Sequence, residues 1–392
     1  MDPSFDIFDP SHYAAVRRPL DEAGHLPAWC YTSEAFYRRE VETIFRKEWI
    51  FLGRADHIPN PGDYFAIEHT GVPLIILRDR QGELRVFANS CRHRGAKLLE
   101  GEGHCASHIV CPYHSWSYAL DGRLIAAPGM QGVKNFDLKD YGLVPVRLES
   151  WGGFLFINFD GNAPGLKSYL GDLTTILESY DFPSMVCTRH KSYELQCNWK
   201  LPVENGLEDY HTATVHRTSI GTQTIEVLDG EGNWEVGFFE SERSIGTLPA
   251  ETARLPWIPS LEGRARRGTH FTLIYPCGKI ACTQDGIFWS LLYPRGPART
   301  DLVVGFGYPR STVAHPDFEA IVAKYYHRCD VSIPEDNNIA EVQQRGLQSP
   351  LAQPSRVSLR EPIVNYFANW VLDRVLADPR EASRMPRRRH AA

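Results

Sequence analysis

Short segments of apolar or alternating residues, each bounded by turn residues, dominate the chain from residue 63 to residue 160. These patterns predict β-strands. The segments are residues 63–69, 72–79, 83–90, 116–120, 123–128 and 151–160. Between the fourth and the fifth, Asp121-Gly122 is a typical two-residue hairpin turn. Because strands joined by short turns pair antiparallel, we expect a small antiparallel β domain over residues 45–160.

A different pattern begins after the Pro- and Gly-containing link at residues 160–166. Apolar runs broken by turn residues predict an antiparallel sheet over residues 270–276, 279–284, 287–294 and 301–309. Helical patterns cover residues 166–180, 316–329, 335–347 and 361–376. The polar residues 231–269 show weak periodicity, and we expect long loops there. Residues 161–392 are therefore predicted to form a domain with helices packed on an antiparallel sheet.

The N-terminal part predicts one helix over residues 33–49, where Phe36, Val41 and Ile44 approximate one apolar face and Ser33 is a suitable N-cap. We expect residues 1–44 to pack on the second domain. The predicted fold class is α+β.

Composition narrows the function. The chain has 392 residues and a net charge of −6, which argues against a protein that tracks nucleic-acid phosphates. Its one basic run, residues 384–390, lies at the C-terminus. No stretch reaches the roughly 18 apolar residues of a membrane helix, and no signal peptide is visible. Nine cysteines without paired spacing indicate reduced thiols, so we expect a cytoplasmic protein.

Two cysteine–histidine pairs form the strongest chemical pattern. Cys91 and His93 make one close pair, and Cys111 and His114 make a second after an intervening stretch of seventeen residues. Two thiolates and two imidazoles suit either a tetrahedral zinc ion or a two-iron, two-sulfur cluster. We favour the cluster, because each loop offers one cysteine and one histidine and both loops can then span both irons.

A second constellation follows near residue 205. Its polar residues are Glu204, Asn205, Glu208, Asp209, His211 and His216. On a helix, Glu204, Glu208 and His211 share one face. His216 joins His211 at one metal only if the helix ends or bends around residues 212–215. Two histidines and one carboxylate form the facial triad of non-haem Fe(II) oxygenases, so a further carboxylate is needed.

The sequence C-x-H, then seventeen residues, then C-P-Y-H-S-W resembles the cluster motif of the Rieske non-haem iron oxygenases. The resemblance runs from AFYRREVETIFRKEWIFLGR to EPIVNYFANW, nearly the whole chain. It implies a Rieske 2Fe–2S cluster on Cys91, His93, Cys111 and His114. It also implies a mononuclear Fe(II) on His211, His216 and a late acid.

The late acid that matches the family position is Asp336, which is expected to open a helix; Glu335 and Asp330 are the fallbacks. An acid in the first turn of a helix is also stabilised by the helix dipole without any metal. The family position of the carboxylate that bridges two subunits falls on Glu208, with Asp209 as its neighbour and Asn205 close by. Glutamate at this position is similar to the branch that acts on betaines and carnitine.

The resemblance further implies a homotrimer that uses O2 and takes electrons from NAD(P)H through a separate ferredoxin-type flavin reductase. This chain lacks the G-x-G-x-x-G turn that would hold a dinucleotide. The expected reaction is hydroxylation or oxidative demethylation of a small quaternary ammonium compound. The alternatives are a dioxygenase or O-demethylase acting on an aromatic acid, and a zinc-stapled binding protein without enzymatic activity. An electron carrier needs only the cluster domain, so it is disfavoured.

Aromatic residues recur in the predicted later strands, but they do not identify the substrate. They are Phe271, Tyr275, Phe288, Trp289 and Tyr293. Such rings either line an apolar pocket or cage a cation, or they belong to the core of the sheet.

Overall fold

The computed structural model describes residues 5–377, so the basic run at residues 384–390 lies outside the described residues. The chain divides into two compact units. The small unit is Leu52–Asn162, and the large unit combines the chain up to Phe51 with the chain from Ala163 onward. The boundaries expected from the sequence were 44/45 and 160/161. No helix within residues 5–377 is long and apolar enough to cross a membrane.

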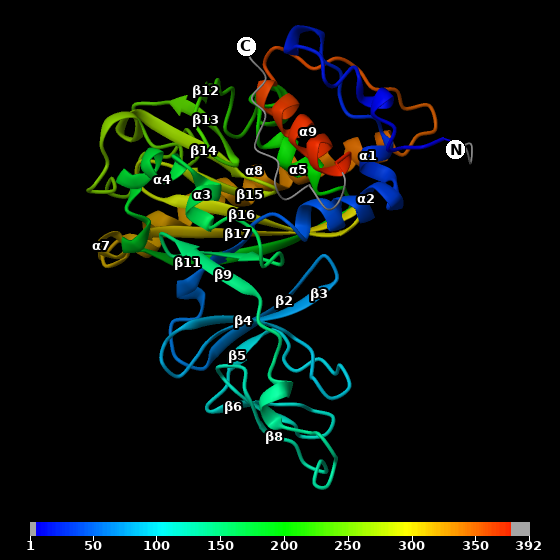
Figure 1. The fold of residues 1–392 in the computed structure, drawn as a ribbon. Helices are drawn as coiled ribbons and strands as arrows, with labels where there is room; N and C mark the ends of the chain where they lie inside the picture. Colours follow the sequence, from blue (N-terminus) through cyan, green and yellow to red (C-terminus); the bar gives the residue numbers. More distant parts are fainter. Residues whose placement is uncertain (1–4, 378–392) are drawn as a thin grey trace. The chain divides into compact units, whose positions relative to one another are not determined.

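The small unit consists of antiparallel strands, as expected (Figure 1). One four-stranded sheet has the order β4-β3-β2-β5, and two three-stranded sheets have the orders β6-β7-β8 and β1-β10-β9. The strands are β1 (Ile50–Arg54), β2 (Asp63–His69), β3 (Val72–Arg78), β4 (Leu84–Ala88), β5 (Glu102–His104), β6 (His108–Val110), β7 (Ser117–Ala119), β8 (Leu124–Ala126), β9 (Arg147–Trp151) and β10 (Phe154–Asn158).

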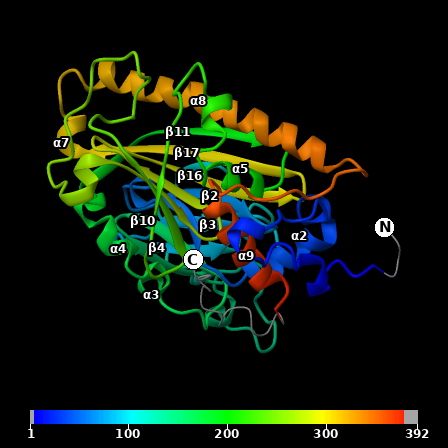
Figure 2. The same cartoon turned by 90° about the horizontal axis from the view of Figure 1, so that it is seen from above.

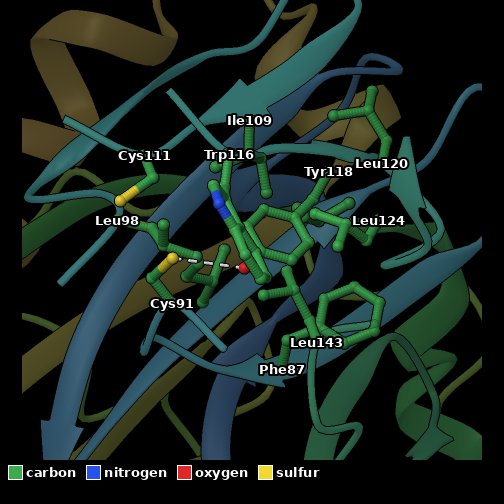
Figure 3. Close-up of a cluster of buried hydrophobic side chains, with 12 residues drawn as sticks. Phe87, Cys91, Leu98, Ile109, Cys111, Trp116, Tyr118, Leu120, Leu124 and Leu143 are labelled. Atoms are coloured by element: carbon green, nitrogen blue, oxygen red, sulfur yellow. Dashed lines mark hydrogen bonds between the residues drawn. The ribbon is translucent and has the colours of Figure 1, made fainter. Parts of the chain in front are cut away.

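The expected hairpin at Asp121-Gly122 joins β7 to β8. Gly122 has φ 91°, and a Cβ there would come within 2.5 Å of the ring of Phe87. Both the left-handed backbone and the packing therefore require glycine. Cys91 and Cys111 belong to the same buried cluster as Phe87, together with Trp116 (Figure 3).

The large unit is built on a seven-stranded antiparallel sheet of order β11-β17-β16-β15-β14-β13-β12. Its strands are β11 (Met185–Leu195), β12 (Glu226–Leu228), β13 (Trp234–Glu240), β14 (Gly268–Ile274), β15 (Gly278–Cys282), β16 (Ile287–Gly296) and β17 (Arg299–Pro309). Its helices are α1 (Trp29–Thr32), α2 (Glu34–Glu40), α3 (Leu166–Leu170), α4 (Leu173–Ile176), α5 (Lys200–Asn205), α6 (Thr212–Val215), α7 (Arg310–Val313), α8 (Phe318–Leu347) and α9 (Pro362–Val375). The predicted α+β fold class is confirmed.

Helix α8 lies along the β11 end of this sheet (Figure 2). Its Tyr326 packs edge-on against Phe306 of β17, with ring centroids 5.0 Å apart. Its Asp330 accepts hydrogen bonds from Arg189 and Lys191 of β11. These contacts pack α8 against β11 and β17.

Three predicted helices were wrong in extent. The helix expected over residues 166–180 is interrupted at Gly171, which has φ 55° and lies so close to the carbonyl oxygen of Glu231 that a Cβ would clash. The helices expected over residues 316–329 and 335–347 are one continuous helix, α8, with Pro334 inside it. Proline interrupts one backbone hydrogen bond there, and the tertiary contacts of α8 hold the helix together across it.

Seven strands were missed, namely β1, β5, β6, β9, β11, β12 and β13. Residues 231–269 were expected to be loops, yet they contain β13, whose Trp234, Val236 and Phe238 are buried. Strand β11 was not predicted at all, because its centre is polar and only partly buried. At the N-terminus, Ser33 does cap α2 by accepting a hydrogen bond from the amide of Phe36. There the expected long helix continues as a short π-helical turn, Val41–Phe45.

Candidate metal centres

The two cysteine–histidine loops of the small unit have the same backbone fold. The amide of Cys91 donates to the carbonyl of Ala96, and that of Cys111 donates to the carbonyl of Trp116, both at 2.8 Å. In each loop the residue four positions after the cysteine has a positive φ, 75° at Gly95 and 58° at Ser115. The local sequences thus form two matching tight turns.

The side chains of these loops carry unsatisfied donor atoms. The rings of His93 and His114 have centroids 4.7 Å apart. The Nδ1 atom of each ring is buried and, within residues 5–377, has no hydrogen-bond partner. Cys91 and Cys111 are buried free thiols. Sγ of Cys91 lies 3.2 Å from the hydroxyl of Tyr118, whereas the two ring nitrogens have no such contact. Buried polar atoms are rarely left without a partner, so these two nitrogens beside two buried thiols indicate metal ligands.

The spacing of these ligands distinguishes between the two possible metal groups, a zinc ion and a two-iron cluster. Around one zinc ion, ligand atoms at roughly 2.0–2.3 Å from the metal cannot be more than about 4.6 Å apart. In residues 5–377, however, no three of these four ligands lie within 4.8 Å of one another. The residues therefore fit a larger group, a two-iron cluster held from both sides by the two loops.

Replacing Cys91 with serine, or His114 with alanine, should remove the visible absorption of the cluster, because each change deletes one of its four ligands. The large unit should still bind its own iron. The measurement is the absorption spectrum together with iron and sulfide per chain, and Cys105→Ser is the matched control. Retained colour in both variants would rule out this ligand set.

The second site lies in the large unit, where a single helical turn brings two histidines together. His211 immediately precedes α6, and His216 immediately follows it. Their rings have centroids 5.2 Å apart. Asp336 on α8 completes the group: its Oδ1 lies 2.9 Å from Nε2 of His216 and 3.5 Å from Nε2 of His211. Candidate ligand atoms of the three residues all lie within 4.8 Å of one another.

The chemistry of this group fits a metal ion. Oδ1 of Asp336 is buried, and among the described residues no group makes a well-oriented hydrogen bond to it, despite the nearby ring nitrogens. Two imidazoles and one carboxylate converging from two elements match the donor set of a non-haem Fe(II) site. The sequence had suggested that Asp336 opens a helix. In the structure, Asp336 lies well inside α8. The helix dipole therefore does not account for this acid.

Two glutamates orient the histidines through their other ring nitrogens. Nδ1 of His211 lies 2.6 Å from Oε1 of Glu208, and Nδ1 of His216 lies 2.7 Å from Oε2 of Glu335. Such partners fix the ring and leave Nε2 for the metal. Glu335 is thus placed as a support of His216, and Asp330 is occupied by Arg189 and Lys191. Neither fallback acid takes the position of Asp336.

The expected shared helix face of Glu204, Glu208 and His211 was wrong. Helix α5 ends at Asn205, and the chain turns before His211. This turn separates Glu208 from Glu204, whose Oε1 accepts a hydrogen bond from the hydroxyl of Tyr31. Gly206 follows the last residue of α5. This glycine was the sequence signal for the end of the helix, and it had been missed.

Glu208 and Asp209 have different surroundings. Glu208 contacts His211 twice, through its ring and through its backbone amide. Asp209 is buried, accepts a hydrogen bond from the amide of Ile225 at 2.7 Å, and forms an ion pair with Arg360. The geometry thus gives Asp209 partners that hold the loop, and leaves Glu208 as the carboxylate joined to a candidate iron ligand.

A cavity opens beside the two histidines and Asp336. It is lined by apolar side chains with a few polar groups, among them Ile220, Ile225, Phe271, Ile280, Phe288, Leu302, Asn205, Lys279, Arg328 and Ser332. Of the five aromatic residues noted in the sequence, Phe271 and Phe288 line it, whereas Tyr275, Trp289 and Tyr293 are buried in the core. Burial lowers the pKa of Lys279 to about 8, against the opposing effect of Asp336.

Buried Glu204 on α5 is expected to make the stability of the protein depend on pH. Burial raises its pKa from 4.5 to about 7. The folded chain therefore binds more protons than the unfolded chain between these values, and stability falls as pH rises through this window, by up to about 3 kcal/mol. In Glu204→Gln, the melting temperature should change less between pH 5 and pH 8 than in the wild type, and should be higher at pH 8. Exposed Glu42→Gln is the control; an equal pH response in both variants would contradict the assignment.

Comparisons with known proteins agree with both sites. Residues 48–137 match the Rieske [2Fe-2S] domain, and residues 184–377 match the ring hydroxylating alpha subunit (catalytic domain). The chain is 30% identical to the carnitine monooxygenase oxygenase subunit of Escherichia coli (strain K12), over 84% of this chain and 85% of that one. It is 27% identical to the glycine betaine monooxygenase oxygenase subunit of Pseudomonas aeruginosa (strain UCBPP-PA14), over 96% of each chain.

Solved structures show the same relationship. A quaternary ammonium Rieske monooxygenase in complex with L-carnitine has a TM-score of 0.74 and 25% identity, covering 90% of this chain and 95% of that one. Naphthalene 1,2-dioxygenase from a Rhodococcus species shares the fold, with a TM-score of 0.78 at 21% identity. The chain therefore belongs to the Rieske non-haem iron oxygenases, as an oxygenase subunit with a 2Fe–2S domain and a mononuclear iron catalytic domain.

Proposed function

We propose that this oxygenase subunit hydroxylates or oxidatively demethylates a small quaternary ammonium compound of the betaine or carnitine type. The observation that carries the proposal is the cavity that opens directly onto His211, His216 and Asp336. The relatives that support the substrate class are named for glycine betaine, carnitine and choline. Membership of the oxygenase family removes the support for a zinc-stapled binding protein.

Each of the two sites would hold one metal group. Cys91, His93, Cys111 and His114 would bind the cluster, and His211, His216 and Asp336 would bind Fe(II). Bound there, Fe(II) supplies open positions for dioxygen. The overall change adds one oxygen atom to a C–H bond and reduces the other to water, with two electrons and two protons consumed.

The chain's own residues prepare this chemistry. Glu208 and Glu335 hold the two imidazoles in one orientation through their Nδ1 atoms. The apolar wall around Ile225, Ile280 and Phe271 keeps bulk water from the reacting atoms. Water exclusion strengthens the interactions of charged groups inside the cavity.

We further propose a cytoplasmic homotrimer in which Glu208 links the cluster of one subunit to the iron of the next. The position of Glu208 against His211 supports this role, because a carboxylate hydrogen-bonded to an iron ligand can extend the path to a second ring. Asp209, with Arg360 and Ile225 as partners, would hold the same loop. Electrons would come from NAD(P)H through a separate ferredoxin-type flavin reductase.

An aromatic acid is the second candidate substrate. The observation in its favour is that Phe271 and Phe288 line the same cavity, where a flat ring could pack between them and the aliphatic wall.

A substrate panel tests the proposal. The purified protein, with NADH and a surrogate reductase, would be given L-carnitine, glycine betaine, choline and benzoate-type acids, and oxygen uptake would be compared with oxidised product. Product formed in step with oxygen from a quaternary ammonium compound is the expected result. If only aromatic acids give product in step with oxygen uptake, the second candidate substrate would replace the quaternary ammonium compound.

A further inference from the structure

We propose that Arg328 binds a carboxylate of the substrate, so that the compound oxidised at the iron site carries a carboxylate as well as the group attacked. This inference deepens the proposed function and rests on it for the identity of the site. Arg328 belongs to α8 and lines the same cavity as the candidate iron ligands.

Arg328 is buried without a matching negative charge. Its side chain belongs to a residue that is only 4% exposed, and its Nε has no acceptor. The one hydrogen-bond contact of its guanidinium within residues 5–377 is from Nη1 to the sulfur of Cys329, at 3.8 Å. Sulfur is a weak acceptor. A guanidinium withdrawn from water normally requires a carboxylate or several good acceptors.

Other equally buried arginines in the described chain do have such partners. Arg54 is 4% exposed and contacts Asp56 at 2.8 Å, and Arg374 is 1% exposed and contacts Glu48 at 2.8 Å. The carboxylate nearest to Arg328 in the sequence, Asp330, is already held by Arg189 and Lys191. Arg328 is thus the arginine whose partner the described chain does not supply.

The helix places Arg328 on the face of α8 that lines the cavity, about two turns before Asp336. Arg328, Ser332 and Asp336 stand at i, i+4 and i+8 on α8, so they share one face, and all three line the cavity. The guanidinium carbon lies 5.6 Å from the ring centroid of Phe288. A planar carboxylate can take two parallel hydrogen bonds from a guanidinium, and the remainder of the molecule would then extend toward the iron ligands.

The other charges of the cavity favour the same class of ligand. Lys279 adds a second side-chain cation, and its Nζ donates to the carbonyl of Pro202 at 2.7 Å. The acids in the lining are Glu208 and Asp336 of the iron site, and Asp209, which is paired with Arg360. A ligand that is only a cation would meet two positive side chains. A zwitterion or an acid would give Arg328 its missing partner.

The test compares each acid with its uncharged amide in the intact holoenzyme. Binding of L-carnitine, L-carnitine amide, benzoate and benzamide would be measured by calorimetry for wild type, Arg328→Gln, Arg328→Lys and the control Arg189→Gln, which changes an arginine outside the cavity. We expect at least one acid to bind wild type roughly 10- to 100-fold more tightly than its amide. Arg328→Gln should erase that preference, Arg328→Lys should keep part of it, and Arg189→Gln should keep it all.

A second readout separates binding from support of the fold. Because the wild-type guanidinium is buried without a partner, Arg328→Gln should melt at the same or a higher temperature, with unchanged cluster absorption and iron content. For an acid that is turned over, KM should rise more than kcat falls. A lower melting temperature with an intact acid preference, or no acid preference in wild type for any pair, would overturn the inference.

The outcomes also distinguish this inference from the proposed function. If only the aromatic acid binds and it depends on Arg328, the quaternary ammonium class is wrong but the carboxylate site stands. If choline, which has no carboxylate, is turned over as well as L-carnitine, the carboxylate site is wrong while the proposed function stands.

Discussion

Alanine at His211, His216 or Asp336 will abolish turnover and mononuclear iron binding while leaving a reducible cluster. Each change removes one of the three candidate ligands, whose donor atoms lie within 4.8 Å of one another. The cluster ligands lie in the other unit of the chain, so their absorption should persist. The measurements are iron per chain, the visible spectrum and product formation.

Two further variants test whether the loss of iron is specific to the three ligands. Glu335→Gln alters the support of His216 and keeps all three ligands, so iron affinity should fall by roughly 10- to 100-fold, and excess Fe(II) should restore activity. Asp330→Asn alters a neighbouring acid on α8 that is paired with Arg189 and Lys191, and iron should be unaffected. Normal product formation by any of the three alanine variants would show that its residue is not a ligand.

Glu208→Gln will retain both metal groups and bind substrate, yet electron transfer from the cluster to the iron site will slow by orders of magnitude. The amide oxygen can still accept the hydrogen bond from Nδ1 of His211, although not the second one from its backbone amide, so the imidazole should stay in place. The amide has no negative charge to hold a second imidazole from the next subunit. The measurement is a single turnover with pre-reduced cluster, following cluster re-oxidation after oxygen and substrate are added.

Asp209→Asn is the matched control for this experiment. It removes the charge that pairs with Arg360, so stability should fall by about 1–3 kcal/mol, but cluster re-oxidation should keep its wild-type rate. Wild-type rates in Glu208→Gln would remove this residue from the path. A collapse confined to Asp209→Asn would transfer the bridging role to its neighbour.

Prediction from sequence succeeded where the deciding information is local. The strands over residues 63–69 and 72–79 were placed nearly to the residue, because alternation and short turns determine them. Prediction failed where packing overrides the local pattern. Helix α8 passes through Pro334, and β11 is polar along much of its length; each is held by partners distant in the sequence, such as the contacts from Asp330 to Arg189 and Lys191.

The candidate sites divide in the same way. Cys91 and His93, like Cys111 and His114, lie within a few residues of each other, so their spacing alone indicated a metal group. Asp336 lies more than a hundred residues beyond His216, and only the family resemblance suggested it. The distinction between Glu208 and Asp209 was invisible in the sequence, because it depends on Arg360 and on the amide of Ile225.

The sequence by itself determined the fold class, the cluster loops and the pair of histidines, because these depend on periodicity and on spacing within single segments. Only the tertiary structure decided which acid faces the histidines and which acids support them. It also revealed that Arg328 is buried beside the cavity without a partner. An arginine within a helical pattern normally indicates a solvent-exposed face, and burial arises from the packing of several elements, which no local pattern records.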